Sequence, residues 1–350
     1  MAKLKYYHNL DGIRAIAALM VIVFHFMYSS LPNSIHINLL KKITLFGEHG
    51  VSLFFVLSGF VITRILINTQ GNDSYFSSFY KKRALRIFPL YYFYLILINF
   101  IFPILSTLKL SSFSFSWSHY LFLQNVLDFD NKISGPGHFW SLAVEEHFYL
   151  FWPLIIYFTP IKHLFKTIFI GVIIVFIIKF IMLKNGLCIN YFTLTRIDQL
   201  MFGAILALLE KNKFFDKDIS SKIMLKLGGG VLIILIFVFG LQSKFPIFKE
   251  ILKYPLMGLF FMSILGYLIA KQHSLPNKLL TSSVLQYLGK ISFGIYIYHM
   301  FAIQLMERFW HTGNLILDLF LVILFTTIFA HLSYYYFELK FLKLKDKIKR

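Results

Sequence analysis

The sequence has few of the residues on which disulfide-rich and soluble proteins depend. Cys188 is its one cysteine, so no disulfide can form within the chain. Charged residues make up 15% of the 350 residues, whereas soluble domains carry roughly 25%. Acidic residues are especially scarce, with 16 Asp and Glu against 35 Lys and Arg. These shortages exclude a disulfide-linked scaffold and argue against a soluble enzyme or a disordered chain.

The sequence is rich in apolar side chains instead. Hydrophobic residues make up 58% of the chain, and Phe alone occurs 42 times. The mean hydropathy is +0.70. A soluble fold of this size has too little interior to bury so much apolar surface. The apolar stretches are continuous and do not alternate with polar residues, which favours helices over a transmembrane barrel. We therefore predict an all-α, polytopic integral membrane protein.

Ten apolar stretches approach the length needed to cross the hydrocarbon layer, which takes about 20 helical residues. We predict a single transmembrane domain over residues 1–350, built from about ten helices. The first stretch contains Arg14 and is followed by no small-residue cleavage site, so we do not expect a cleavable signal. The predicted spans lie near residues 12–28, 51–68, 88–108, 139–159, 167–183, 196–209, 227–241, 254–270, 291–306 and 315–337.

The distribution of positive charge predicts the orientation of these helices. If the N-terminus is cytoplasmic, 24 of the 35 Lys and Arg residues fall in cytoplasmic segments and nine fall on the opposite side. Cytoplasmic loops typically show this bias, so we predict that both termini are cytoplasmic and that residues 109–138 form the longest outside loop. The formal net charge of +19 then reflects topology and contact with the lipid bilayer. We expect no nucleic-acid partner, because no soluble basic module is present.

Arg14 and His25 are ionisable residues within the first predicted span. In lipid such a side chain costs several kcal/mol unless it faces protein, water or a partner. The two residues are eleven positions apart, so they should lie on one helical face, roughly 16 Å apart along the axis. This pattern favours two functional groups on one helix. The alternative is an Arg14 that extends to the headgroups and a His25 at the opposite interface.

Arg83 and Arg86 are three positions apart just before the third predicted span. This spacing puts both guanidinium groups on one helical face at the cytoplasmic end of the span. Arginine forks suit polyanions, so the pair could form a phosphate clamp. The alternative is the ordinary positive charge of a cytoplasmic loop.

Glu145 belongs to a polar stripe at the head of the fourth predicted span. Ser141, Glu145 and Tyr149 recur every four residues, and Glu146 adds a second acid. Two adjacent acids are costly at this place in a membrane helix. Stabilisation by the helix N-terminus would explain one of them, so the pair favours a functional role.

Four other polar residues are better explained by structure. Arg196 and Asp198 lie close together at the head of the sixth predicted span, and we expect them to neutralise each other. His299 and His331 are single histidines in the last two spans. A lone histidine in a helix bundle is more often a hydrogen-bonded packing residue than a catalytic group.

Several of these segments together resemble motifs of the membrane acyltransferase-3 family. Asp11 to Arg14, followed by His25, resembles its Arg-x10-His signature, and Arg83 to Arg86 is similar to its Arg-x-x-Arg motif. Other similar segments are residues 54–60, 139–150, 196–198 with Gly203, and 289–299. Each motif is weak alone, but all occur in the family's order across nearly the whole chain.

The resemblance implies a multi-pass enzyme of the bacterial inner membrane. Family members move an acyl group, usually acetyl, from cytoplasmic acyl-CoA to an acceptor, often a sugar hydroxyl. Acceptors include lipopolysaccharide, other surface polysaccharides and lipid-linked sugars. Some members carry a C-terminal SGNH-type domain, and this chain resembles the stand-alone type. Acetyl-CoA is the implied donor, and no metal is implied.

The resemblance and the chemistry of the side chains together suggest roles for five residues. Arg83 and Arg86 would bind the phosphates of acyl-CoA. His25 would act as general base on the acceptor hydroxyl or as a transient acyl carrier. Arg14 would orient the donor or polarise its thioester. Glu145 would orient His25 or support the acceptor.

A transporter or flippase of lipid-linked saccharides is the rival interpretation. Ten spans with intramembrane His, Arg and Glu also fit that class. Against it, the two halves of the sequence show no repeat symmetry and no paired broken helices. The sequence carries no indication of oligomeric state.

Overall fold

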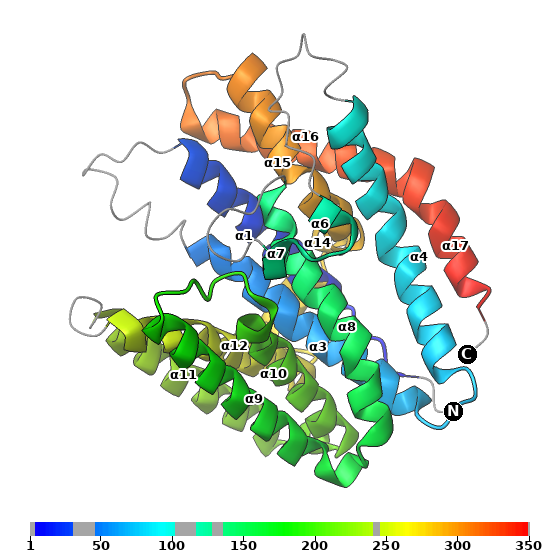
Figure 1. Ribbon diagram of the computed structural model, residues 1–350, viewed down its shortest axis with the longest axis vertical. Helices are drawn as coiled ribbons and strands as arrows, with labels where there is room; N and C mark the ends of the chain where they lie inside the picture. The colour runs from blue at the N-terminus through cyan, green and yellow to red at the C-terminus, as the bar shows by residue number, and fades with distance from the viewer. Residues whose placement is uncertain (1–3, 31–45, 102–116, 128–135, 241–245, 349–350) are drawn as a thin grey trace. The chain divides into compact units, whose positions relative to one another are not determined.

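The structure, a computed structural model, describes residues 4–30, 46–101, 117–127, 136–240 and 246–348 (Figure 1). Within these ranges the regular elements are helices and no residue forms a strand, so the predicted all-α class is confirmed. The chain forms two compact units that alternate along the sequence. Unit 1 comprises Met1–Tyr6, Ser52–Tyr75 and Ser114–Asn277, and unit 2 comprises Tyr7–Val51, Phe76–Phe113 and Lys278–Arg350. The single domain over residues 1–350 stays a prediction.

Unit 1 contains most of α3 and the helices from α6 to α12 (Figure 1). Within it, α9, α10 and α12 pack against one another, and α11 packs on α12. Its elements are α3 (Gly50–Thr69), α6 (Trp117–Tyr120), α7 (Gln124–Leu127), η5 (Gly137–Phe139), α8 (Trp140–Phe158), α9 (Ile161–Lys184), α10 (Thr193–Lys211), η6 (Phe214–Asp216), α11 (Ile219–Gly240), α12 (Pro246–Ala270) and the first part of α13 (Leu275–Leu280).

Unit 2 is built around the first helix, α1, which packs against α14, α15 and α16. Two segments of π-helix, η3 and η7, extend α4 and α16. The elements of unit 2 are α1 (Asn9–Ser30), η2 (Phe46–His49), nearly all of α4 (Tyr75–Ile96), η3 (Leu97–Ile101), α14 (Ser283–Lys290), α15 (Ser292–Phe309), α16 (Leu315–Ser333), η7 (Tyr334–Glu338) and α17 (Leu339–Asp346).

Seven helical segments of the described ranges are long and apolar enough to cross a membrane. They correspond to seven of the ten predicted spans, although residues 102–108 and 241 of those predictions lie outside the described residues. The polytopic character is therefore confirmed. The segments are Asn9–Ser30, Phe46–Thr69, Tyr75–Ile101, Ile161–Lys184, Ile219–Gly240, Pro246–Ala270 and Leu315–Lys345.

The other three predicted spans, 139–159, 196–209 and 291–306, are the helices α8, α10 and α15. Each carries polar residues that lower its apolar character, such as Glu145, Asp198 and His299. Most residues of α10 are buried, so this helix faces protein and does not need an apolar surface for lipid. By contrast, only 22% of the most apolar window of α9 is buried. The count of ten spans and the cytoplasmic termini stay predictions.

Glycines of the recognised motifs permit close helix contacts in unit 1. A Cβ at Gly59 of α3 would overlap the carbonyl oxygen of Leu200, and a Cβ at Gly203 of α10 would overlap the carbonyl oxygen of Val56. Two glycines on facing helices thus bring the backbones of α3 and α10 together. Membrane helices commonly use small residues in this way, because close backbone approach strengthens packing where no hydrophobic effect drives association.

Unit 2 contains a second contact of the same kind. A Cβ at Gly12 of α1 would overlap the carbonyl oxygen of Leu280, and a Cβ at Gly289 of α14 would overlap the carbonyl oxygen of Asp11. These glycines belong to the first and last motifs of the sequence. Gly12 lets the end of α13 approach α1, and Gly289 lets α14 approach the beginning of α1.

A buried ion pair joins α9 to α10 in unit 1. The Nζ of Lys179 lies 2.5 Å from Oδ2 of Asp198, and both side chains are 0% exposed. The Asp198 Oδ1 also accepts a hydrogen bond from the backbone N–H of Gln199 at 2.9 Å. The expected neutralisation of Asp198 by Arg196 is therefore wrong, because the carboxylate of Asp198 is taken by a lysine from the preceding helix.

We predict that Gly203→Ala destabilises the protein, whereas Gly230→Ala does not. The new methyl group at residue 203 would collide with the backbone of α3, and such overpacking costs about 1–3 kcal/mol. No atom lies within 4 Å of a Cβ at Gly230 of α11, so there alanine should be neutral or favour the helix. Thermal unfolding of the detergent-solubilised variants measures the difference. Equal melting temperatures for the two variants would contradict the close packing of α3 on α10.

We also predict that Lys179→Met is much more damaging alone than together with Asp198→Asn. The single change leaves a buried carboxylate without its counter-charge, at a cost of about 3–5 kcal/mol, whereas removing both charges avoids most of that cost. The folded yield and melting temperature of the single and double variants test this coupling. A double variant no more stable than Lys179→Met would show that the two charges do not act as a pair.

Candidate active site

Two histidines from distant parts of the sequence meet in unit 2. His25 lies on α1 and His299 lies on α15. The Nε2 of His299 is 3.2 Å from Nδ1 of His25, and the ring centroids are 4.9 Å apart. His299 is fully buried, whereas His25 is partly exposed. His299 is therefore buried and hydrogen-bonded, as expected, but it is not a lone histidine, because it contacts His25.

Backbone carbonyl groups hold both imidazole rings. The Nδ1 of His25 lies 3.0 Å from the carbonyl oxygen of Val21, one turn earlier on α1. The Nδ1 of His299 lies 2.6 Å from the carbonyl oxygen of Tyr296. The Tyr296 ring also packs near the His299 ring, with centroids 5.6 Å apart. Both histidines are thus fixed by their own helices.

Arg14 lies on the same unbroken helix as His25, as predicted. Its Nη1 is 2.5 Å from Oδ1 of Asp11, three residues earlier. Along a continuous helix, eleven residues correspond to roughly 16 Å. The structure therefore pairs Arg14 with an acid at the beginning of α1, well separated along the axis from the imidazole of His25.

Arg83 and Arg86 lie within α4, which begins before the third predicted span and continues through the arginines. The guanidinium of Arg83 lies 6.0 Å from the centre of the Phe79 ring. Arg86 is exposed, and its charge interacts with the carboxylate of Glu338 at the end of η7. Glu338 also accepts a hydrogen bond from Ser333 Oγ at 3.1 Å.

More basic and aromatic side chains gather around η7 in unit 2. The Nζ of Lys290 lies 5.1 Å and 5.4 Å from the ring centres of Tyr334 and Tyr335. Tyr287 and His331 form a close hydrogen bond. Burial and the neighbouring Tyr335 raise the pKa of the Tyr287 hydroxyl, which favours its protonated form. The sequence singled out His331, but it could not identify Tyr287 as its partner, because Tyr287 lies on another helix.

Glu145 lies on α8 in unit 1, where two hydroxyl groups bind it. Ser58 of α3 donates to its Oε1 at 2.7 Å, and Tyr149 donates to its Oε2 at 3.0 Å. Within the predicted polar stripe of α8, Glu145 and Tyr149 are therefore joined by a hydrogen bond. Glu145 and His25 belong to different units, and the role of Glu145 towards His25 or the acceptor stays a prediction.

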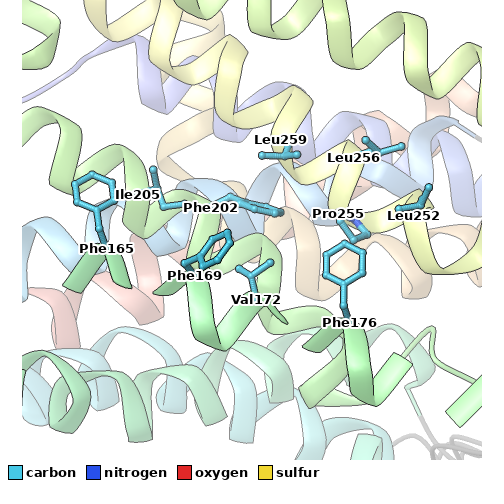
Figure 2. Close-up of a pocket in the computed structure, with 10 residues that line it drawn as sticks. All are labelled: Phe165, Phe169, Val172, Phe176, Phe202, Ile205, Leu252, Pro255, Leu256 and Leu259. Atoms are coloured by element: carbon cyan, nitrogen blue, oxygen red, sulfur yellow. The ribbon is translucent and has the colours of Figure 1, made fainter. Parts of the chain in front are cut away.

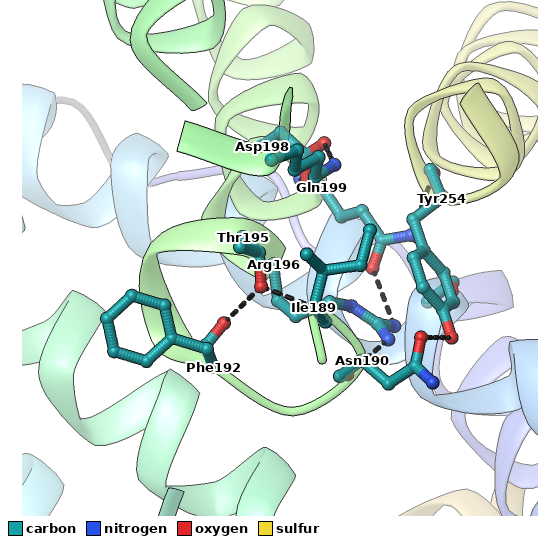
Figure 3. Close-up of polar contacts among 10 residues, drawn as sticks. Ile189, Asn190, Phe192, Thr195, Arg196, Asp198, Gln199 and Tyr254 are labelled. Carbon is teal, nitrogen blue, oxygen red and sulfur yellow. Dashed lines mark hydrogen bonds and ion pairs between the residues drawn. The ribbon is translucent and has the colours of Figure 1, made fainter. Parts of the chain in front are cut away.

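Arg196 is buried in an aromatic and amide cage in unit 1 (Figure 3). Its guanidinium lies 3.6 Å from the centre of the Tyr254 ring and 4.9 Å from that of Trp140. It donates to the carbonyl oxygen of Asn190 at 2.8 Å and to Gln199 Oε1 at 3.3 Å. Aromatic rings and amide oxygens thus stabilise the guanidinium among the described residues, which favours a structural role for the segment 196–198.

The cavity in Figure 2 lies in unit 1 and has no polar lining. It has a volume of about 280 Å³ between α9, α10 and α12. Its walls include Phe165, Phe169 and Phe176 of α9 and Leu252 and Pro255 of α12. Such side chains suit hydrocarbon and supply no group for proton transfer. Neither His25 nor any of the predicted arginines lines this cavity.

Unit 2 therefore contains four of the five predicted site residues, Arg14, His25, Arg83 and Arg86. Their chemistry combines a pair of imidazoles with cations and aromatic rings, which suits proton transfer near an anionic ligand. Among the described residues, no group of three or more His, Cys, Asp or Glu side chains could hold a metal ion.

Comparison with known proteins identifies the family. O-acetyltransferase OatA of Staphylococcus aureus, in strain NCTC 8325 / PS 47 and in strain MRSA252, is 30% identical over 364 aligned residues, covering 95% of this chain and 57% of OatA. The chain thus spans somewhat more than half the length of these relatives. No solved structure matches it significantly. The family model described as an acyltransferase domain matches residues 7–335. This chain belongs to the acyltransferase-3 family, as its motifs predicted.

Proposed function

We propose that the protein is a membrane O-acetyltransferase that moves an acetyl group from cytoplasmic acetyl-CoA to a hydroxyl of a surface or lipid-linked glycan. The observation that carries this proposal is the imidazole of His25, held on α1 beside His299 in the same unit as Arg14, Arg83 and Arg86. Family membership and the name of the OatA relatives support O-acetyl transfer. We place the protein in the bacterial inner membrane.

The basic groups of unit 2 suit the nucleotide end of acetyl-CoA. Arg83 and Arg86 lie three residues apart on α4, so their guanidinium groups can bind neighbouring phosphates. Glu338 interacts with Arg86 and would orient it before the donor binds. Lys290 and the tyrosine rings of η7 supply a further cation and aromatic faces. Arg14, which lies near the beginning of α1, would orient the donor.

His25 supplies the proton transfer that the reaction needs. Its imidazole accepts the proton of the acceptor hydroxyl as the oxygen attacks the thioester carbonyl carbon. The carbon–sulfur bond then breaks, the acetyl group remains on the acceptor oxygen, and the CoA thiolate takes the proton from His25. The products are the acetyl ester and CoA, and His25 returns to its neutral form.

We expect His25→Gln to abolish transfer without preventing membrane insertion, because glutamine keeps a polar side chain but cannot accept the proton. Membrane vesicles from expressing cells would receive acetyl-labelled acetyl-CoA, and label would be counted in the lipid-linked and polymeric saccharide fractions. Release of CoA thiol, measured in parallel, distinguishes an enzyme from a transporter or flippase, which would release none. Labelling of the saccharides by His25→Gln at the wild-type rate would remove His25 from the mechanism.

We expect the double variant Arg83→Ala, Arg86→Ala to need at least about tenfold more acetyl-CoA for half-maximal rate, since each charge-assisted hydrogen bond contributes about 1.5–3 kcal/mol. The matched control is Lys162→Ala, Lys166→Ala, which removes the same charge from exposed positions at the beginning of α9. The acetyl-CoA dependence of transfer in the same vesicles measures both. An unchanged acetyl-CoA dependence in the arginine variant, or an equal change in the lysine variant, would contradict a specific phosphate clamp.

A further inference from the structure

The backbone around the histidine pair determines which ring nitrogen carries each proton. A carbonyl oxygen can only accept a hydrogen bond. The Nδ1 of His25 faces the Val21 carbonyl at 3.0 Å, and the Nδ1 of His299 faces the Tyr296 carbonyl at 2.6 Å. The two carbonyl contacts therefore favour a proton on both Nδ1 atoms, because lone pairs would repel at these distances. In their neutral forms, both rings then have the lone pair on Nε2.

This assignment also explains the contact between the rings. The Nε2 of His299 lies 3.2 Å from Nδ1 of His25. With the assigned protons, this contact is a hydrogen bond in which His25 Nδ1–H donates and His299 Nε2 accepts. The proton on His25 Nδ1 is thus shared between the Val21 carbonyl and His299. The opposite tautomers would leave two carbonyl oxygens facing lone pairs.

We propose that His299 is the positioning residue that holds His25 in its Nδ1–H form and so makes Nε2 of His25 the basic nitrogen. This inference rests on the proposed function, in which His25 is the general base. The acceptor proton moves to Nε2 of His25, and Nδ1–H stays hydrogen-bonded to His299. No proton passes to His299, because its Nε2 remains an acceptor and its Nδ1–H remains on the Tyr296 carbonyl.

The same hydrogen bond becomes stronger when the base is used. Proton uptake turns His25 into an imidazolium, and a hydrogen bond from a charged donor is shorter and stronger than a neutral one. His299 therefore stabilises the charged form that develops as the acceptor is deprotonated. Carboxylates orient the histidine in many catalytic triads, but an uncharged acceptor suits the full burial of His299, where a carboxylate would pay a large desolvation cost.

The test compares His299→Leu, which removes the acceptor, with His299→Gln, whose amide oxygen can take the place of Nε2. We expect His299→Leu to lower kcat by about 10- to 100-fold, as removal of an outer hydrogen-bond partner does for metal-bound histidines, with little change in the KM for acetyl-CoA. His299→Gln should recover most of kcat. A residue that only fills space would give the opposite order, because leucine packs better than glutamine in an apolar core. The control is His311→Gln, an exposed histidine of unit 2 whose ring pairs with Asp318.

A measurement without substrate separates this inference from the proposed function. Nitrogen-15 NMR of histidine-labelled protein reports which ring nitrogens carry protons, and a His25→Gln sample identifies the His25 signals. We expect a protonated Nδ1 and a bare Nε2 on His25 in the wild-type protein and in His299→Gln, and a shift towards the other tautomer in His299→Leu. A wild-type His25 protonated on Nε2, or His299→Leu with wild-type kcat, would overturn the inference. If wild-type vesicles transfer no acetyl group, the proposed function fails, and the NMR result decides the histidine pairing by itself.

Discussion

Each ionisable group that this chain carries into its apolar interior must find a partner there, and this constraint explains much of the structure. A charge or polar group without one would cost several kcal/mol in such surroundings. Lys179 and Asp198 meet this requirement as an ion pair, and Arg196 meets it with rings and amides. Glu145 is bound by two hydroxyls, and His25 is bound by His299. The first two solutions suit stability, because their groups are fully enclosed. The contact between His25 and His299 leaves a partly exposed imidazole with a defined basic nitrogen, which suits proton transfer.

The sequence alone predicts the helices well because hydrophobic length is a local property. Seven predicted spans correspond to apolar helices, and the remaining three are present as helices with lower hydropathy. The length criterion could not anticipate how α10 is surrounded. A helix enclosed by protein can carry Arg196, Asp198 and Gln199 on its buried faces. Its hydropathy therefore does not predict whether it lies within the membrane protein or in water. Motif glycines such as Gly203 could be recognised in the sequence. Their role in close helix packing became visible only with the facing backbone of α3.

Pairing between helices is the part of the site that the sequence could not specify. Spacing along one helix put Glu145 and Tyr149 on one polar stripe, where the structure joins them by a hydrogen bond, and it correctly put Arg14 and His25 on one helix. It failed where the partner came from elsewhere. Asp198 forms its ion pair with Lys179 and not with its near neighbour Arg196, because side chains two positions apart on a helix point in different directions. His299 lies 274 residues from His25, and no local pattern connects two such positions. The apparent isolation of a histidine in the sequence is therefore no reason to exclude it from an active site.

Helix α1 links the two ends of the proposed reaction. Because it is continuous from Asn9 to Ser30, the axial distance between Arg14 and His25 is set by the rise of about 1.5 Å per residue. Gly289 lets α14 approach Asp11 at the beginning of α1, and His299 holds the ring of His25 from α15. These two contacts come from consecutive helices of one segment, Ser283–Lys290 and Ser292–Phe309. The segment that fixes the position of α1 therefore also fixes the proton on its imidazole, so that placement of the base and choice of its basic nitrogen depend on the same packing.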